Sequence, residues 1–383
     1  MSSHQIAMRQ VSLLNFGLGV SARLVDDLVG AAAQSVLIVT TPPVLQTAQE
    51  IADQICAKGI AATVWHDSGS EPSVSDFESL LAIAQSGNTD AVVGIGGGSS
   101  MDLAKLVAVL LDSHQTIADV QHNGLEGPRN CWLACIPTTA GTGSEVSPIA
   151  ILLDEDDLLK KGIVSPHLVP DAAYIDPLLT TTMPPSVTAA TGLDALTHCI
   201  EAYANRFAHP LIDTLALEGV SLVFRSLLAA VRDGNNVQAR TDMARASYYG
   251  GLCLGPVNTA AVHALAYPLG GEFHVAHGVS NAILLPHVIA FNLSAAEDRY
   301  AAIAIAAGAS REGTNAEIAR EGLALIEGLC RECGVPMRLS DHGVPSDALD
   351  RMTDGAMTVT RLLDRNVRTV EWADARKIYE AAY

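Results

Sequence analysis

Basic residues are scarce in this sequence. Lys and Arg together number 23 against 42 Asp and Glu, which gives a formal net charge of −19 over 383 residues. The chain also lacks an extended run of basic residues. Because a protein that neutralises nucleic-acid phosphates needs clustered Lys and Arg, this charge balance argues against a nucleic-acid partner.

Long apolar runs, a secretory leader and a cysteine metal motif are also missing. No stretch reaches the ~18 consecutive apolar residues of a membrane helix, and the opening "MSSHQIAMRQ" lacks a signal-peptide pattern. Seven cysteines cannot all pair, and "CREC" at Cys330 to Cys333 has no second CxxC to complete a zinc ribbon. We therefore expect a cytoplasmic protein with no membrane partner, whose cysteines are free thiols.

The first half of the sequence alternates between strand and helix patterns. Apolar, β-branched runs at residues 35–41, 60–66, 90–100 and 131–137 predict strands, the third of them running into glycines. Helical spacing of apolar residues covers 42–59, 73–86 and 101–113. Strands that alternate with helices, without polar alternation along each strand, predict a parallel sheet covered on both faces.

The pattern changes near "LTTTMPPSVTAATG", residues 179–192. Beyond it strand patterns almost disappear, and helical spacing dominates residues 193–204, 211–234, 239–253 and 313–334. We therefore expect two domains: residues 1–184 form an α/β nucleotide-binding domain and residues 185–383 form an all-α domain.

Two loops rich in small residues follow predicted strands. In "GIGGGSSMDLAK", residues 94–105, glycines lead into a helix whose free N–H groups can bind a phosphate, although a tight turn that needs positive φ is the alternative. The third glycine of G-x-G-x-x-G is replaced by Ser99 and no G-K-[ST] follows, so neither common nucleotide motif is present. "PTTAGTGSEVSP", residues 137–148, is the second loop. Together they predict a nucleotide site at the carboxyl edge of the sheet.

Four side chains in the second half form a candidate metal site. In "TGLDALTHCIEAY", Asp194 and His198 would project from one face of a helix, where burial is costly unless they pair with each other or bind a metal. His263 and His277, within residues 261–287, would add two nitrogen ligands. One oxygen and three nitrogens suit Fe²⁺ or Zn²⁺ and leave a position for water or substrate, although the same set can also close a non-catalytic tetrahedral site.

Four motifs, in this order, resemble the iron-containing alcohol dehydrogenase family: "GGGSSMDLAK", "PTTAGTGSEV", "GLDALTHCIEAY" and "AVHALAYPLGGEFHVAHGVSNAILLPH". The resemblance covers nearly the whole chain. It implies a dehydroquinate-synthase-like fold with an NAD- or NADP-binding α/β domain and a helical domain that holds one divalent metal, Fe²⁺ or Zn²⁺. It also implies hydride transfer between the cofactor and a small alcohol, aldehyde or ketone, in a homodimer or larger homo-oligomer.

The resemblance also assigns individual positions. The metal ligands of the family correspond to the four residues assembled above from spacing. The pyrophosphate loop of the family corresponds to Gly97, Gly98 and Ser99, and Asp102 corresponds to a position near the nicotinamide. The second cofactor loop corresponds to Thr138, Thr139 and Thr142. Lys160 corresponds to a lysine that reaches the cofactor.

Two positions depart from the family pattern. Many members have a histidine, credited with proton relay, where this chain has Tyr267, so Tyr267, His274 and water are all candidates for that role. Many members that prefer NAD end the first cofactor strand with Asp, whose charge would repel the 2′-phosphate of NADP. In this chain the strand ends at Thr41, so the choice between NAD and NADP stays open.

Other enzymes of the same fold are the alternatives. Glycerol dehydrogenases keep a zinc site, dehydroquinate synthases need basic residues for a phosphate substrate, and maleylacetate reductases resemble this chain at "TTPP" but lack the complete metal set. The intact Asp194 favours a metal-dependent alcohol dehydrogenase.

Overall fold

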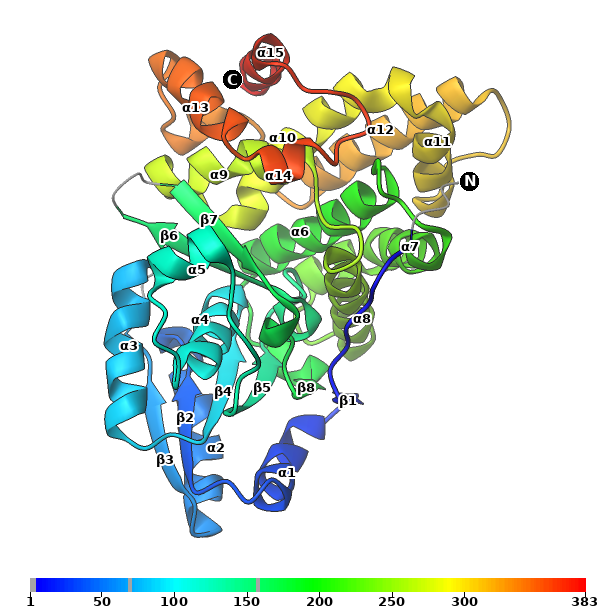
Figure 1. Ribbon diagram of the computed structural model, residues 1–383. Helices are drawn as coiled ribbons and strands as arrows, with labels where there is room; N and C mark the ends of the chain where they lie inside the picture. The colour runs from blue at the N-terminus through cyan, green and yellow to red at the C-terminus, as the bar shows by residue number, and fades with distance from the viewer. Residues whose placement is uncertain (1–4, 68–70, 156–158) are drawn as a thin grey trace. The chain divides into compact units, whose positions relative to one another are not determined.

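The chain folds into two compact units. The computed structural model describes residues 5–67, 71–155 and 159–383 (Figure 1). The α/β unit comprises Arg9–Thr139 and Gly143–Thr181. The helical unit comprises Thr182–Tyr383 with Ala140–Thr142 and the described residues before Arg9. All strands of the described residues belong to the α/β unit.

A six-stranded parallel sheet forms the centre of the α/β unit, with the strand order β1-β8-β5-β4-β2-β3. A separate antiparallel pair is formed by β6 and β7. The strands are β1 (Leu13–Phe16), β2 (Ser35–Val39), β3 (Ala61–Trp65), β4 (Ala91–Gly96), β5 (Trp132–Pro137), β6 (Ile149–Asp154), β7 (Leu159–Val164) and β8 (Ala172–Ile175). The helices are α1 (Leu24–Gly30), α2 (Leu45–Ala57), α3 (Val74–Ser86), α4 (Gly98–Leu110) and α5 (Ile117–Asn123).

Both faces of this sheet are buried. Because successive strand side chains point to opposite faces, Leu37 and Val39 of β2 join a core cluster with α3, α4 and α5. Val36 and Ile38 of the same strand join a second cluster, on the other face, with α1 and α2. Burial on both faces explains why these strands read as continuous apolar runs, and the predicted parallel sheet covered on both faces is confirmed.

Four strands were missing from the sequence prediction. β1 and β8 are only four residues long and pair with each other at one side of the sheet. The β6–β7 pair contains Lys160 and Lys161 and lies outside the main sheet. Short or polar strands carry too little periodic signal to be separated from loops.

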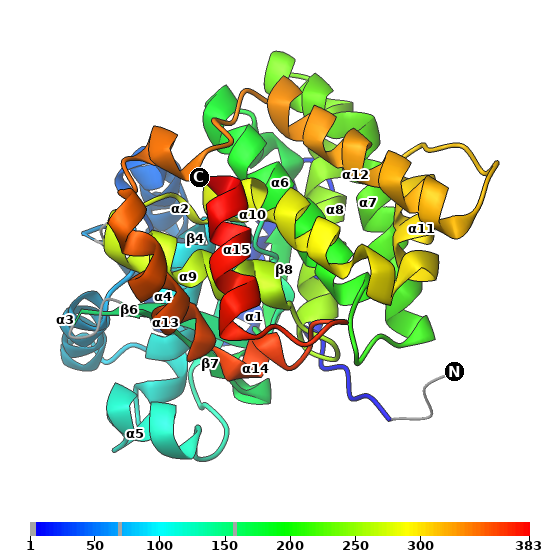
Figure 2. The same cartoon turned by 90° about the horizontal axis from the view of Figure 1, so that it is seen from above.

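The helical unit contains ten α-helices among its described residues. They are α6 (Pro185–Tyr203), α7 (Pro210–Arg232), α8 (Val237–Leu254), α9 (Ala261–Phe273), α10 (His277–Asn292), α11 (Glu297–Ala306), α12 (Asn315–Glu332), α13 (Leu349–Met357), α14 (Thr360–Leu363) and α15 (Trp372–Ala382). Helix α6 contacts α7, α8, α9 and α10, whereas α11 pairs with α12, and α15 lies against α10 and α13 (Figure 2). The largely helical second half is therefore confirmed.

Two segments of the described residues, Pro210–Arg232 and His277–Ala295, are long and apolar enough to cross a membrane by length and composition alone. Core helices pass the same test, and both segments contribute buried side chains to the helical unit. All seven cysteines are free, as the odd count predicted, and six of them are buried.

Candidate functional site

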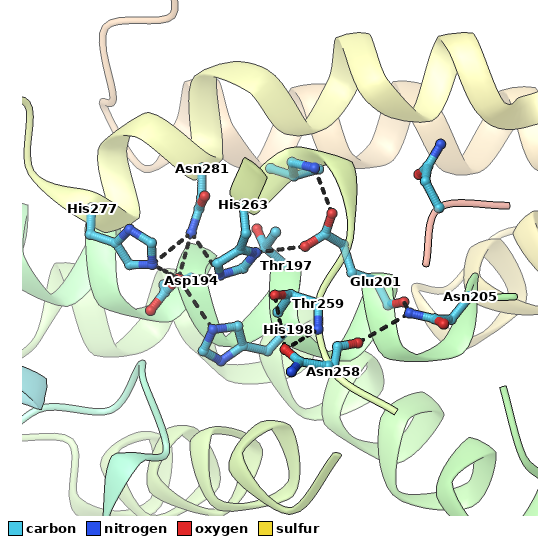
Figure 3. A network of polar contacts seen from close by, with 12 residues as sticks. Asp194, Thr197, His198, Glu201, Asn205, Asn258, Thr259, His263, His277 and Asn281 are labelled. Atoms are coloured by element: carbon cyan, nitrogen blue, oxygen red, sulfur yellow. Dashed lines mark hydrogen bonds and ion pairs between the residues drawn. The ribbon is translucent and has the colours of Figure 1, made fainter. Parts of the chain in front are cut away.

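The four predicted metal-ligand candidates converge inside the helical unit. Helix α6 contributes Asp194 and His198, α9 contributes His263, and α10 begins with His277 (Figure 3). One ligand atom from each side chain lies within 4.8 Å of all the others. Among the described residues, this is the one group of three or more His, Cys, Asp or Glu side chains arranged in this way.

The spacing of these atoms fits a small cation. The Oδ1 atom of Asp194 lies 3.8 Å from His198 Nε2, 3.7 Å from His263 Nε2 and 3.6 Å from His277 Nε2. A regular tetrahedron with ligand bonds of about 2.1 Å has edges of about 3.4 Å. The observed distances are only slightly longer, so small side-chain adjustments would bring one oxygen and three nitrogens onto a single divalent ion.

An amide donor contacts three of these four atoms. Asn281, on α10 one turn after His277, is fully buried, and its Nδ2 donates to Asp194 Oδ1 at 2.7 Å. The same nitrogen lies 3.1 Å from His263 Nε2 and 3.2 Å from His277 Nε2. One amide nitrogen in contact with three of the four potential ligand atoms shows that these atoms converge on a single point, which is the arrangement a cation requires.

Burial and charge act together on this cluster. Burial by itself raises the pKa of Asp194, but the neighbouring His198, His277 and His263 hold that pKa well below its usual range. Burial lowers the pKa of His198 to about 4 despite the attraction of Asp194. Burial also lowers the pKa of His263, but the neighbouring carboxylates Asp194 and Glu201 outweigh this effect and raise the pKa to about 9.

Close helix packing brings the ligands together. Almost all of α6 from Thr188 to Tyr203 is buried, so its polar side chains must find partners inside the unit. Gly278, directly after His277, allows α10 to meet α6: a Cβ at this position would lie 2.1 Å from the carbonyl oxygen of Ala190. The first turn of α10 can therefore present His277 to Asp194 only because residue 278 has no side chain.

Glu201 is a second polar neighbour that the sequence analysis missed. Its Oε2 lies 2.6 Å from His263 Nδ1, and its Oε1 accepts from the Val262 N–H at 2.6 Å (Figure 3). Glu201 follows Asp194 by two helical turns, and Asn281 follows His277 by one. This helical spacing was a visible signal, but it identifies only a shared helix face and not the helix that packs against it.

The candidates for proton relay lie in the same region of the chain. Tyr267 is buried on α9, one turn after His263. His274 is the C-terminal cap of α9 and has a left-handed backbone with φ of 54°. Neither residue belongs to the cluster of four.

The predicted glycine loop lies between β4 and α4 in the α/β unit. Gly97 is the N-terminal cap of α4, and Gly98 and Ser99 begin its first turn, so the positive end of the helix dipole lies at this loop. Gly96 has a φ of 151°, and a Cβ there would lie 2.5 Å from Ser100 Oγ and 3.9 Å from Thr41 Oγ1. This geometry requires glycine, as the tight-turn alternative expected, and phosphate binding by the loop stays a prediction.

The loops that follow three neighbouring strands meet at this edge. β2 pairs with β4, and β4 pairs with β5, so Thr41, Gly97 and Thr139 follow adjacent strand ends. Thr138 N–H donates to Gly96 O at 2.9 Å. The chain leaves β2 toward β3 on one side, and later leaves β4 toward β5 on the other. Such a reversal of strand order is where open α/β sheets bind ligands.

Asp102 and Lys160, both expected near a cofactor, have partners within the α/β unit. The Asp102 carboxylate accepts from Ser144 Oγ at 2.5 Å and from the Ile151 N–H at 3.0 Å, and it lies 3.8 Å from Lys105 Nζ. Burial raises the pKa of Asp102 against the attraction of Lys105. Lys160, on β7, pairs with Glu71 at 2.7 Å. The remaining candidate, Thr142, is grouped with the helical unit.

Comparison with known proteins covers both units. Residues 13–177 match the family model of iron-containing alcohol dehydrogenase, and residues 188–383 match that of the Fe-containing alcohol dehydrogenase family, C-terminal. The chain is 39% identical over 379 residues to long-chain-alcohol dehydrogenase 1 of Geobacillus thermodenitrificans, covering 97% of this chain and 95% of that protein.

Solved structures agree with these matches. A 1,3-propanediol oxidoreductase superposes with a TM-score of 0.94 at 30% identity, covering 99% of this chain and 100% of its own. The sulfoacetaldehyde reductase of Bifidobacterium kashiwanohense, solved in complex with NAD⁺, superposes with a TM-score of 0.88 at 26% identity, covering 99% of each chain.

Proposed function

The chain belongs to the iron-containing alcohol dehydrogenase family, and from this premise we propose how its own residues serve the reaction. As a member it is an oxidoreductase that transfers hydride between a small alcohol, aldehyde or ketone and NAD or NADP. We propose that residues 1–184 bind the nicotinamide cofactor and that residues 185–383 bind one divalent metal, Fe²⁺ or Zn²⁺.

The convergence of Asp194, His198, His263 and His277 is the observation that supports the metal assignment. A bound Fe²⁺ or Zn²⁺ supplies a Lewis acid that polarises a hydroxyl or carbonyl oxygen, and the nicotinamide supplies or accepts the hydride. The protein contributes one carboxylate and three imidazole nitrogens; Asp194, His198 and His263 are buried, and His277 is partly exposed. Tyr267, one turn after His263, is our candidate for proton transfer, with His274 or water as the alternatives.

We propose that the loop around Gly97, Gly98 and Ser99 binds the pyrophosphate, because it combines a helix N-terminus with backbone that has little side-chain bulk. Thr138, Thr139 and Thr142 would supply hydroxyls from the second loop, Asp102 would lie near the nicotinamide, and Lys160 would reach the cofactor. Thr41 carries no charge that would repel a 2′-phosphate, so both NAD and NADP should be tested.

The named relatives support a broad range of substrates. Their names refer to long-chain alcohols, to 1,3-propanediol and to sulfoacetaldehyde, all of which are alcohols or carbonyl compounds. For this chain we propose a small alcohol and the corresponding aldehyde or ketone. We further propose a cytoplasmic homodimer or larger homo-oligomer, supported by the reduced cysteines and by the edge strand β1, where Leu13 and Leu14 are exposed.

The proposal is tested by metal reconstitution. Metal-free protein is loaded separately with Fe²⁺ and Zn²⁺. Turnover is followed at the nicotinamide absorbance, with NAD⁺ or NADP⁺ for a panel of alcohols and with NADH or NADPH for the corresponding aldehydes. We expect turnover to require the metal. His263→Ala should lose both metal and turnover, whereas His287→Ala, on α10 but outside the cluster, should keep both. Undiminished turnover by the metal-free protein, or metal retention by His263→Ala, would contradict the assignment.

A further inference from the structure

We propose that Glu201 is a positioning residue of the metal centre, which fixes the tautomer and orientation of His263 while it caps helix α9. This inference rests on the metal site proposed above. Glu201 is buried on α6, on the face that also carries Asp194 and His198. It does not belong to the four-residue cluster, so its role is to act through His263.

The two carboxylate oxygens of Glu201 have separate partners. Oε2 lies 2.6 Å from His263 Nδ1, and Oε1 accepts from the Val262 backbone N–H, also at 2.6 Å. An ionised carboxylate can only accept hydrogen bonds, so the first contact requires a proton on His263 Nδ1. A histidine that binds a metal is neutral, and with its proton on Nδ1 the lone pair lies on Nε2, the atom that faces Asp194 Oδ1 at 3.7 Å.

The opposite side of the His263 ring agrees with this tautomer. Asn281 Nδ2, a donor, lies 3.1 Å from His263 Nε2. The ring is therefore placed between an acceptor at Nδ1 and a donor at Nε2. Both neighbours favour the form in which Nε2 is available to bind a cation.

Glu201 also supports the start of the helix that carries His263. Helix α9 begins at Ala261, and its cap, Ala260, has no side chain that could accept a hydrogen bond. The Val262 N–H is one of the groups at a helix N-terminus that lack a partner within the helix, and a carboxylate there also interacts favourably with the helix dipole. The Glu201 carboxylate thus holds the backbone of Val262 and the side chain of the next residue, His263.

A second contact network ties this part of α6 to the segment before α9. Asn205 Nδ2 donates to Glu201 O at 3.0 Å and to Asn258 O at 3.1 Å (Figure 3). Asn258 has a left-handed backbone with φ of 78°, and its Oδ1 accepts from the Thr259 N–H at 2.8 Å. The approach of the chain to α9 is therefore held against the helix that carries Glu201.

Charge gives a further reason for a carboxylate at this position. Three neutral imidazoles and the Asp194 carboxylate leave a divalent ion with one uncompensated positive charge in a buried site. Glu201, one imidazole away, brings the total to neutrality, and burying an unbalanced charge is costly. His198 has no equivalent partner among the residues that the structure describes: its buried Nδ1 makes no hydrogen bond with them. Glu201 should therefore affect metal binding through His263 and not through His198.

The test replaces Glu201 with Gln, which has the same shape but one N–H₂ in place of an oxygen. Gln can accept from only one of its two neighbours, so either the Val262 N–H loses its partner or His263 Nδ1 faces a donor. A matched control is Asp242→Asn, which removes a buried carboxylate of the same unit that accepts from Ser226 Oγ at 2.9 Å and lies outside the cluster. Glu201→Asp keeps the charge but is one methylene shorter and cannot reach both partners.

Affinities for Zn²⁺ are measured on the full-length protein by competition with a chromogenic chelator, together with the visible absorption of the Co²⁺-loaded protein. We expect Glu201→Gln to bind Zn²⁺ 10- to 100-fold more weakly, with shifted Co²⁺ bands, and Glu201→Asp to change in the same direction. Asp242→Asn should be less heat-stable but should keep its Zn²⁺ affinity and its Co²⁺ spectrum.

The outcomes separate this inference from the proposed function. Failure of the unsubstituted protein to bind Zn²⁺ or Co²⁺ would reject the metal site itself. If the unsubstituted protein binds both ions, wild-type affinity and spectrum in the Glu201 variants would overturn the positioning role. A lower thermal midpoint without any change in metal affinity or spectrum would show that Glu201 only caps helix α9. That result would also overturn the positioning role. Should Glu201→Gln fail to fold, Glu201→Asp provides the same comparison.

Discussion

Gly278 provides a direct test of how the helical unit assembles its metal centre. A Cβ added at this position would lie 2.1 Å from the carbonyl oxygen of Ala190 and 2.6 Å from its carbonyl carbon. Both atoms are backbone, so no side-chain rotation can relieve the contact. Because carbon and oxygen atoms in contact are normally at least about 3.3 Å apart, the first turn of α10 would have to move away from α6 by roughly 1 Å.

The movement would act on the metal ligands directly. His277 precedes Gly278, and its Nε2 lies 3.6 Å from Asp194 Oδ1 on α6. Metal–ligand distances tolerate only about ±0.2 Å, so a displacement of roughly 1 Å should remove His277 from the coordination sphere. We expect Gly278→Ala to weaken Zn²⁺ binding by more than about 10-fold. Overpacking should lower the metal-free stability by about 1–3 kcal/mol, partly offset by the better helix propensity of Ala, about 1 kcal/mol.

Two other glycine variants separate packing from metal binding. Gly322→Ala would place its Cβ 2.4 Å from the Cβ of Ala304, between α11 and α12, so it should lose stability but keep Zn²⁺ affinity. Gly328→Ala meets nothing within 4 Å and should gain about 0.5–1 kcal/mol. Chelator competition and chemical denaturation of the metal-free proteins provide both readouts. Wild-type Zn²⁺ affinity in Gly278→Ala would refute the reasoning.

Three further predictions concern the α/β unit. Gly96→Ala, at φ of 151° and 2.5 Å from Ser100 Oγ, should lose about 1–3 kcal/mol of stability and should bind NADH more weakly in a calorimetric titration. Burial raises the pKa of Glu145 from its ordinary value of 4.5 to about 7, so the folded state holds this proton more tightly than the unfolded state does. The stability contribution of Glu145 therefore falls as pH rises from about 4.5 to about 7. In urea unfolding, the free energy of unfolding of Glu145→Gln should rise relative to that of the wild type by up to about 3 kcal/mol between pH 4 and pH 8. A difference in stability between the two proteins that does not change with pH would contradict this. Lys105→Met removes a fully buried ammonium that donates to Ser144 Oγ, Ser147 O and Ile149 O, and should cost about 3–5 kcal/mol in the same measurement.

Much of the α/β unit was predictable from local patterns. The residues of β2, β4 and β5 form continuous apolar runs because both faces of the sheet are buried, and the intervening helices have regular apolar spacing. Strand β1 was not predictable in this way. Its four residues include Leu13 and Leu14, which are exposed, so the strand is formed by pairing with β8, about 160 residues away in the chain, and not by its own pattern.

The metal-ligand candidates were also accessible to sequence analysis, for two different reasons. Asp194 and His198 share a helix face through their four-residue spacing, whereas His263 and His277 were joined to them by residue type within a second apolar, helix-like stretch. The tertiary structure places all four together. It also adds Asn281 and Glu201, each of which contacts a metal-ligand candidate on another helix.

The sequence by itself thus determined which faces of which segments carry polar atoms into the core, because helical and strand periodicity depends on neighbours within a turn or two. The tertiary structure decided which of those faces meet. That choice depends on long-range packing, such as the contact of α10 with α6 at Gly278, and on the need for every buried polar atom to find a partner. Residues such as Glu201, which act on a ligand carried by another helix, can be identified only after that packing is known.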